Sequence, residues 1–185
     1  DGFDETRERL DLLALDSDPL RLARVQETLN RLRLHGAGQA GSRVELRAGD
    51  ARLPATWWDG RPFDGILLDA PCTASGIVRR HPDVRWLRRA SDIDNLAAIQ
   101  KNLLKQLWPL VKPGGRLLYC TCSVFKAEGE NQAKAFVEHN THARLVPTLG
   151  HLRPQNAANG DGLVDNLPGD HDGFYYALFE KLPAA

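Results

Sequence analysis

The chain has 185 residues, of which 42% are hydrophobic and 26% are charged, as in an ordinary globular domain. No apolar run approaches the roughly 18 residues that span a bilayer, and Asp1-Gly2-Phe3-Asp4-Glu5 does not resemble a signal peptide, so we expect a cytoplasmic protein without a membrane segment. Its 24 basic and 24 acidic residues cancel, so nucleic-acid binding would have to depend on a local basic patch.

Strand and helix patterns alternate in the first half of the chain. A strand from Leu10 to Leu15 ends at Asp16, and a helix with Asp18 as its N-cap and Pro19 in its first turn follows. Its apolar residues recur at helical spacing, and Gly36-Ala37-Gly38 ends it. A short strand, Val44-Glu45-Leu46, leads to Asp50, and the next strand runs from Phe63 to Leu68.

The second half continues the alternation. A helix is predicted from about Ile93 until Lys112-Pro113-Gly114-Gly115 breaks it, and a strand through Tyr119 follows. The remaining predicted elements are a helix at about 128–139, a strand at 144–146, a long loop at 150–172 and an aromatic-rich strand at 173–179. This order indicates an α/β fold with a mostly parallel sheet, formed by residues 1–185 as a single domain.

Two similar stretches end predicted strands with a thiol. Ile66-Leu67-Leu68 leads directly to Asp69 and Cys72, and the strand that begins at Leu117 leads to Cys122. Uninterrupted apolar runs of this kind are typical of strands that are buried on both faces. Because ligands bind at the carboxyl ends of parallel strands, we expect both thiols in one site.

The three cysteines are an odd number, and none forms a C-x-x-C pair. This spacing argues against a disulfide framework and a closed zinc site, so we expect no metal. The thiols are then either inert core residues or a reactive pair. Inside its strand, Cys120 is interpreted as a small buried residue, whereas Cys72 and Cys122 lie beyond strand ends and favour chemistry.

Carboxylates close three successive strands, at Asp16, Asp50 and Asp69. An acid in this position commonly binds ribose hydroxyls, which suits Asp16, and Asp50 could accept the amino group of a purine. For any one of them, a helix-cap or turn role is about as plausible. Together they favour a nucleoside-type cofactor, although no glycine-rich loop precedes Leu10.

A basic segment follows Cys72. It contains Trp86, His81 and the arginines Arg79, Arg80, Arg85, Arg88 and Arg89. Guanidinium groups pair with phosphates, and arginine or tryptophan can stack on unpaired bases. Most charge runs are simply solvated faces, but the position beside Cys72 favours RNA contact by Arg79, Arg80 and Arg85.

The motifs of this chain resemble those of the RNA cytosine-5 methyltransferases, in particular the RsmB (Sun or Fmu) type that modifies 16S ribosomal RNA. The resemblance runs from about Leu12 to Lys181 and includes Asp69-Ala70-Pro71-Cys72, Arg79-Arg80-His81-Pro82-Asp83, Trp86, Thr121-Cys122-Ser123 and Asp172-Gly173-Phe174-Tyr175. It implies a Rossmann-like, S-adenosylmethionine-dependent methyltransferase that is rRNA-binding, takes part in rRNA processing and is monomeric.

The resemblance also implies a role for each candidate residue. Asp16 would bind the cofactor ribose, Asp50 would lie at the adenine, and Asp69 would lie beside the methionine end and the target base. Cys122 corresponds to the family's nucleophile, and Cys72 to the thiol that helps release the product. Such an enzyme methylates carbon 5 of cytosine through a covalent cysteine adduct.

One departure concerns the cofactor. The family's first strand, its glycine-rich loop and an N-terminal RNA-binding domain would all lie before Asp1, so we expect a catalytic-domain fragment that binds cofactor weakly. Two alternatives remain open. An amino-directed nucleic-acid methyltransferase would share the fold but usually carries an aromatic residue in place of Cys72, and a non-catalytic RNA-binding remnant would keep only the arginine segment.

Overall fold

The computed structural model describes residues 10–34, 43–154 and 171–183. The chain forms two compact units, residues 1–59 and residues 60–185, and each is described by itself. None of the helices in these described ranges combines the length and apolar character needed to cross a membrane.

The first unit is built on two parallel strands, β1 (Asp11–Asp16) and β2 (Arg43–Ala48), which are joined through helix α1 (Pro19–Arg31). The side chain of Asp18 accepts a hydrogen bond from the backbone N–H of Leu20 (2.9 Å), which confirms the predicted N-cap. The predicted glycine stop at 36–38 lies outside the described residues. A 3₁₀ turn, η1 (Pro54–Thr56), follows β2.

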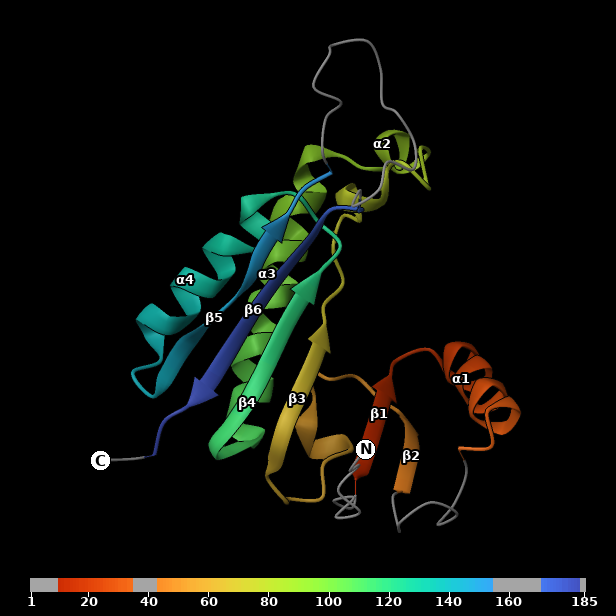
Figure 1. Cartoon of the computed structure of the whole chain (residues 1–185), viewed down its shortest axis with the longest axis vertical. Helices are drawn as coiled ribbons and strands as arrows, with labels where there is room; N and C mark the ends of the chain where they lie inside the picture. Colours follow the sequence, from red (N-terminus) through yellow and green to blue (C-terminus); the bar gives the residue numbers. More distant parts are fainter. Residues whose placement is uncertain (1–9, 35–42, 155–170, 184–185) are drawn as a thin grey trace, which may run out of the picture. The chain divides into compact units, whose positions relative to one another are not determined.

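The second unit is a four-stranded sheet in the order β3 (Phe63–Asp69), β4 (Val111–Thr121), β6 (Phe174–Lys181) and β5 (Ala143–Leu152). Strand β3 pairs with β4 in parallel, and β6 is antiparallel to both of its neighbours, so three of these four strands run in the same direction. Helices α3 (Ala90–Leu107) and α4 (Glu130–His139) lie on one face of this sheet (Figure 1). The α/β fold is confirmed.

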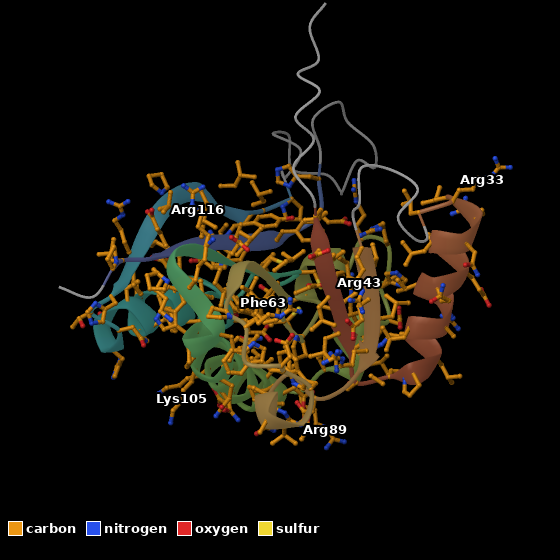
Figure 2. All side chains as sticks on the ribbon, turned by 90° about the horizontal axis from the view of Figure 1, so that it is seen from below. Arg33, Arg43, Phe63, Arg89, Lys105 and Arg116 are labelled. Atoms are coloured by element: carbon orange, nitrogen blue, oxygen red, sulfur yellow. The ribbon has the colours of Figure 1, made fainter. Side chains whose placement is uncertain are left out.

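Alternation along β4 separates the packed face of the sheet from the other face. Leu117 and Tyr119 have no exposed surface, and Leu104 of α3 and Phe179 of β6 are also buried in the core. In Figure 2, Arg116 of β4 lies on the sheet side of this unit and Lys105 of α3 lies on the helix side. The shorter elements of this unit are α2 (Val84–Leu87), η2 (Ser75–Ile77), η3 (Trp108–Leu110) and η4 (Lys126–Glu128).

The glycine pair that was predicted to break the long helix lies inside β4 instead. Helix α3 ends at Leu107, just before Pro109, which has no N–H to continue the helical hydrogen bonds. Residues 112–115 form a bulge in β4, because the register passes from Phe63 opposite Val111 to Gly65 opposite Arg116. Gly114 supplies the positive φ of +78° that this bulge requires.

Strand β5 is longer than predicted, so the expected loop at 150–172 is wrong at its start. Its pairing with β6 is interrupted between Val146 and Gly150 and then resumes as far as Leu152. Pro147 and Gly150 interrupt the alternation of residues that is typical of a strand, and Gly150 has a positive φ (+62°). Residues 155–170 of the expected loop lie outside the described part of the chain, and the helix predicted from residue 128 begins at Glu130.

Candidate active site

Strands β3 and β4 bring the two predicted thiols into contact. The strands are parallel neighbours, with Asp69 opposite Cys120, so their carboxyl ends lie at the same edge of the sheet. Beyond these ends, the N–H of Gly76 donates to the carbonyl oxygen of Cys122 (2.9 Å). The sulfur atoms of Cys72 and Cys122 are 3.4 Å apart, and both residues are half-buried.

The segment after Cys72 lies against the start of β6, and two glycines allow the close contact. Ala74 has a left-handed conformation (φ 59°) directly before η2. The N–H of Gly173 donates to the carbonyl oxygen of Gly76 (2.8 Å). A methyl group on Gly76 would overlap the carbonyl group of Gly173, and one on Gly173 would overlap the side chain of Val124. Both glycines are therefore needed to let the start of β6 pack against the thiol segments.

The two thiols differ in acidity because one hydrogen-bonds to the other. With Cys72 as the donor, this hydrogen bond stabilises a thiolate on Cys122, which lowers the pKa of Cys122 to about 7 despite partial burial and the nearby Asp69 carboxylate. The same hydrogen bond, followed by burial, raises the pKa of Cys72. Of the two thiols, Cys122 is therefore the one that ionises near neutral pH, and only an ionised thiol is a strong nucleophile.

Cys120, interpreted from the sequence as an enclosed core residue, is only half-buried. Its sulfur lies 3.6 Å from the carbonyl oxygen of Leu68 and 3.9 Å from Oδ1 of Asp69. Burial first, and then the Asp69 carboxylate, raise the pKa of Cys120 to about 11. This thiol therefore stays protonated near neutral pH, and Asp69 lies beside it at an exposed strand end.

Sequence reasoning missed a buried carboxylate behind the thiols. Glu128 is fully buried and accepts hydrogen bonds from Thr73 and Ser123, the residues that directly follow Cys72 and Cys122. From the sequence, position 128 is expected only to begin a helix. Its role leaves no periodic signal, and the one available hint was a small hydroxyl residue after each thiol.

The predicted cofactor carboxylates Asp16 and Asp50 lie in the first unit. Because β1 and β2 are parallel neighbours, the two acids end up at the same edge of that sheet. Oδ1 of Asp16 accepts from the N–H of Asp18 and from Arg21 (both 2.8 Å). The Asp50 carboxylate is bound by the guanidinium and the N–H of Arg52, whose side chain is the main cause of a lowered Asp50 pKa.

The three arginines predicted to contact RNA are in different environments. Arg79 and Arg80 form ion pairs with Asp172 (3.4 and 2.5 Å), which is only 7% exposed, so they fasten the basic segment to the start of β6. Arg85 lies on α2 and is exposed. Next to it, Trp86 is 82% exposed. Arg88, by contrast, donates to the carbonyl oxygen of Thr73 (3.0 Å), beside Cys72.

The sequence as a whole matches a known family. The family model described as 16S rRNA methyltransferase RsmB/F covers residues 6–180. The chain belongs to the RsmB/F family. It is 46% identical over 172 residues to ribosomal RNA small subunit methyltransferase B of Vibrio cholerae, and 43% identical over 180 residues to the protein of that name from Serratia proteamaculans. These matches cover 92% and 96% of this chain but only 36% and 38% of the relatives, so the chain spans well under half of their length.

A solved structure shares the fold of this chain. The crystal structure of NSun6 from Pyrococcus horikoshii with SFG superposes with a TM-score of 0.70 at 26% identity, over 94% of this chain and 42% of that one. The RsmB/F resemblance inferred from the motifs is therefore confirmed, together with an α/β fold of the methyltransferase kind. Within the described residues, no group of three or more His, Cys, Asp or Glu side chains is placed to hold a metal ion.

Proposed function

We propose that the protein to which this chain belongs methylates carbon 5 of a cytosine in 16S ribosomal RNA, with Cys122 as nucleophile and Cys72 as the thiol that helps release the product. The observation that carries this proposal is the 3.4 Å contact between the two sulfur atoms at the carboxyl ends of β3 and β4. A covalent route at carbon 5 is a reaction for which two adjacent thiols with different acidities are useful.

The chemistry explains why a thiolate is needed. Carbon 5 of cytosine is a weak nucleophile, and addition of the Cys122 thiolate to carbon 6 forms a carbon–sulfur bond and makes carbon 5 enamine-like. After carbon 5 has taken the methyl group, it loses its proton to a general base. That electron pair restores the ring double bond and expels the Cys122 sulfur as a thiolate. Cys72, which already holds a proton beside this sulfur, is placed to assist this release.

S-adenosylmethionine, when bound, supplies the methyl group on a positively charged sulfur. The residues of this chain fit it in part. Both described hydrogen bonds to the Asp16 side chain end on Oδ1, so Oδ2 can accept a ribose hydroxyl. Asp50 is a less suitable adenine contact, because Arg52 already binds both of its oxygens. We retain Asp69 as the proposed contact at the methionine end.

The exposed pair Arg85–Trp86 on α2 is the proposed RNA contact that the geometry favours most. Arginine can pair with a phosphate while tryptophan stacks on an unpaired base, and the target cytosine must be unstacked to be methylated. Arg79 and Arg80 already form ion pairs with Asp172, so their proposed contribution to RNA binding is smaller than that of Arg85.

Trapping of a covalent intermediate tests the proposal. The protein, or its Cys72→Ala or Cys122→Ala variant, is mixed with 16S RNA and cofactor and then run on a denaturing gel. We expect a persistent protein–RNA adduct with Cys72→Ala, because release is impaired, and none with Cys122→Ala. Adduct that survives Cys122→Ala would overturn the assigned roles.

Methyl-transfer and RNA-binding assays on the same variants separate the alternatives. Methyl transfer that persists without either thiol would indicate an amino-directed enzyme. Salt-sensitive RNA binding with neither adduct nor methyl transfer, at saturating cofactor, would indicate a non-catalytic RNA-binding remnant.

A further inference from the structure

The buried carboxylate of Glu128 accepts four hydrogen bonds. Its Oε1 accepts from the N–H of Thr73 (2.9 Å) and from Nε2 of Gln100 (3.2 Å), and its Oε2 accepts from the hydroxyls of Thr73 and Ser123 (both 2.6 Å). A carboxylate offers about four acceptor positions, so these donors fill it. A fully buried acid with this arrangement is expensive to maintain unless it organises something.

Glu128 connects the segment that follows Cys72 to the segment that follows Cys122. Thr73 follows Cys72 and Ser123 follows Cys122, so a single side chain holds the neighbour of each thiol. Because the Ser123 hydroxyl donates to Glu128, the 3.1 Å contact between Ser75 and Ser123 must have Ser75 as donor. Ser75 in turn accepts from the N–H of Val124 (3.1 Å). The network is therefore directional and spans both segments.

Hydrogen bonds from Tyr119 and Gln100 hold this network against the sheet and helix α3. The hydroxyl of Tyr119, which has no exposed surface, donates to the carbonyl oxygen of Glu128 (2.6 Å). Gln100 of α3 donates a further hydrogen bond to the carbonyl oxygen of Pro71 (2.9 Å), directly before Cys72. Glu128 is thereby anchored to the sheet through Tyr119, and the Cys72 segment is anchored to α3.

We propose that Glu128 is a positioning residue that sets the separation and orientation of the Cys72–Cys122 pair through Thr73 and Ser123. The inference rests on the proposed function only in treating the thiol pair as the reactive centre. Glu128 is shielded behind the residues that it holds and acts through them rather than on the substrate. Without it, Thr73 and Ser123 would lose their shared acceptor, and the sulfur-to-sulfur hydrogen bond would lengthen.

Positioning and simple electrostatics make opposite predictions for Glu128→Gln. The negative charge of Glu128 by itself raises the pKa of Cys122, so removal of the charge alone would lower that pKa and speed alkylation. Loss of positioning weakens the hydrogen bond from Cys72, which is the main cause of the lowered Cys122 pKa. Positioning therefore predicts a higher pKa and slower alkylation at neutral pH.

The test measures the rate of Cys122 alkylation by iodoacetamide against pH, with peptide mass spectrometry to identify the modified thiol. The 185-residue chain carries Cys120→Ala throughout, and circular dichroism checks that each variant folds. We expect Glu128→Gln to lower the rate at pH 7 roughly fivefold, which corresponds to a rise of about one pKa unit. The matched control, Glu130→Gln, removes a partly exposed carboxylate from the adjacent helix and leaves the profile unchanged.

If Glu128→Gln does not fold, Thr73→Val takes its place, because it keeps the shape of the side chain and removes one donor to Oε2. We expect a smaller shift in the same direction. An unchanged or accelerated rate in the folded variant would overturn the positioning role. The wild-type profile tests the proposed function separately, since a midpoint at the ordinary thiol value of about 8.5 would contradict an activated Cys122.

Discussion

At the scale of single residues, the asymmetry between Cys72 and Cys122 comes from their mutual contact. Neither thiol is paired with a lysine, arginine or histidine in the described hydrogen bonds, and the stabilisation of the Cys122 thiolate comes first from Cys72. Burial and the Asp69 carboxylate oppose it. The reactivity of Cys122 should therefore depend directly on its neighbour.

Removal of the Cys72 thiol should raise the pKa of Cys122 above its present value of about 7. In Cys72→Ala, the thiolate loses its hydrogen-bond donor while burial and Asp69 remain. Because only the thiolate reacts, alkylation of Cys122 at pH 7 should slow by about tenfold and recover as the pH rises. Cys120→Ala serves as the control and should leave the rate unchanged. An equal rate in Cys72→Ala would show that the sulfur contact does not activate Cys122.

Residues at the ends of strands could be predicted from the sequence. The buried residues that hold them in place could not. Cys72 and Cys122 follow recognisable apolar runs, so their approach could be predicted from the rule for parallel strands. Glu128 and Asp172 could not be found in this way, because their partners are distant in sequence and depend on how loops fold back. In the sequence, Asp172 stands out only as part of a motif, whereas in the structure it pairs with Arg79 and Arg80.

At the scale of elements, the segment from Cys72 to Val78 depends on backbone contact with the start of β6. A methyl group on Gly76 would overlap the carbonyl group of Gly173 and lie 2.8 Å from its Cα. Separation of the two backbones would also disturb the hydrogen bond from Gly76 to Cys122. The position of Cys72 is therefore linked to a strand that follows it by about a hundred residues.

We expect Gly76→Ala to lower the free energy of unfolding by roughly 1–3 kcal/mol, the usual cost of forcing extra volume into a packed site. It should also slow alkylation of Cys122, because the thiol segments move apart. Urea denaturation and the alkylation assay measure the two effects. Gly65→Ala is the matched control, because the nearest atom to its added methyl group would be 3.8 Å away. Equal stability of the two variants would contradict the close approach at Gly76.

The basic segment divides into two parts with different consequences. Arg85→Ala should weaken RNA binding severalfold, because it removes one phosphate contact. The slope of the logarithm of the binding constant against the logarithm of the salt concentration should become less steep by about one. Filter binding at several salt concentrations measures both quantities. Lys105→Ala on α3, another exposed cation, should leave them unchanged. An effect of Lys105→Ala equal to that of Arg85→Ala would indicate binding without a defined patch.

Element boundaries were predicted well where one signal acted alone. Asp18 and Pro19 marked the start of α1 correctly, and the apolar runs located β3 and β4. Errors arose where two interpretations of the same residues competed. Gly114-Gly115 looked like a helix stop but forms a bulge in β4, and Pro147 and Gly150 concealed the second half of β5.

At the scale of the whole molecule, the alternation of strands and helices was enough to predict an α/β fold, and the paired thiol motifs were enough to predict the RsmB/F family. The antiparallel placement of β6 was not predictable, because local sequence does not encode strand order. Because the formal net charge is zero, the proposed contact with RNA would depend on local groups such as Arg85.

The central claim is that Cys122, and not Cys72 or Cys120, forms the bond to the cytosine. Its most direct test is to digest the adduct of the Cys72→Ala variant with nuclease and protease and to locate the attached nucleotide by mass spectrometry. We expect a methylated cytidine nucleotide on the peptide that contains Cys122, bound to that sulfur. A nucleotide on Cys120, or an adduct that forms equally well in Cys122→Ala, would contradict it.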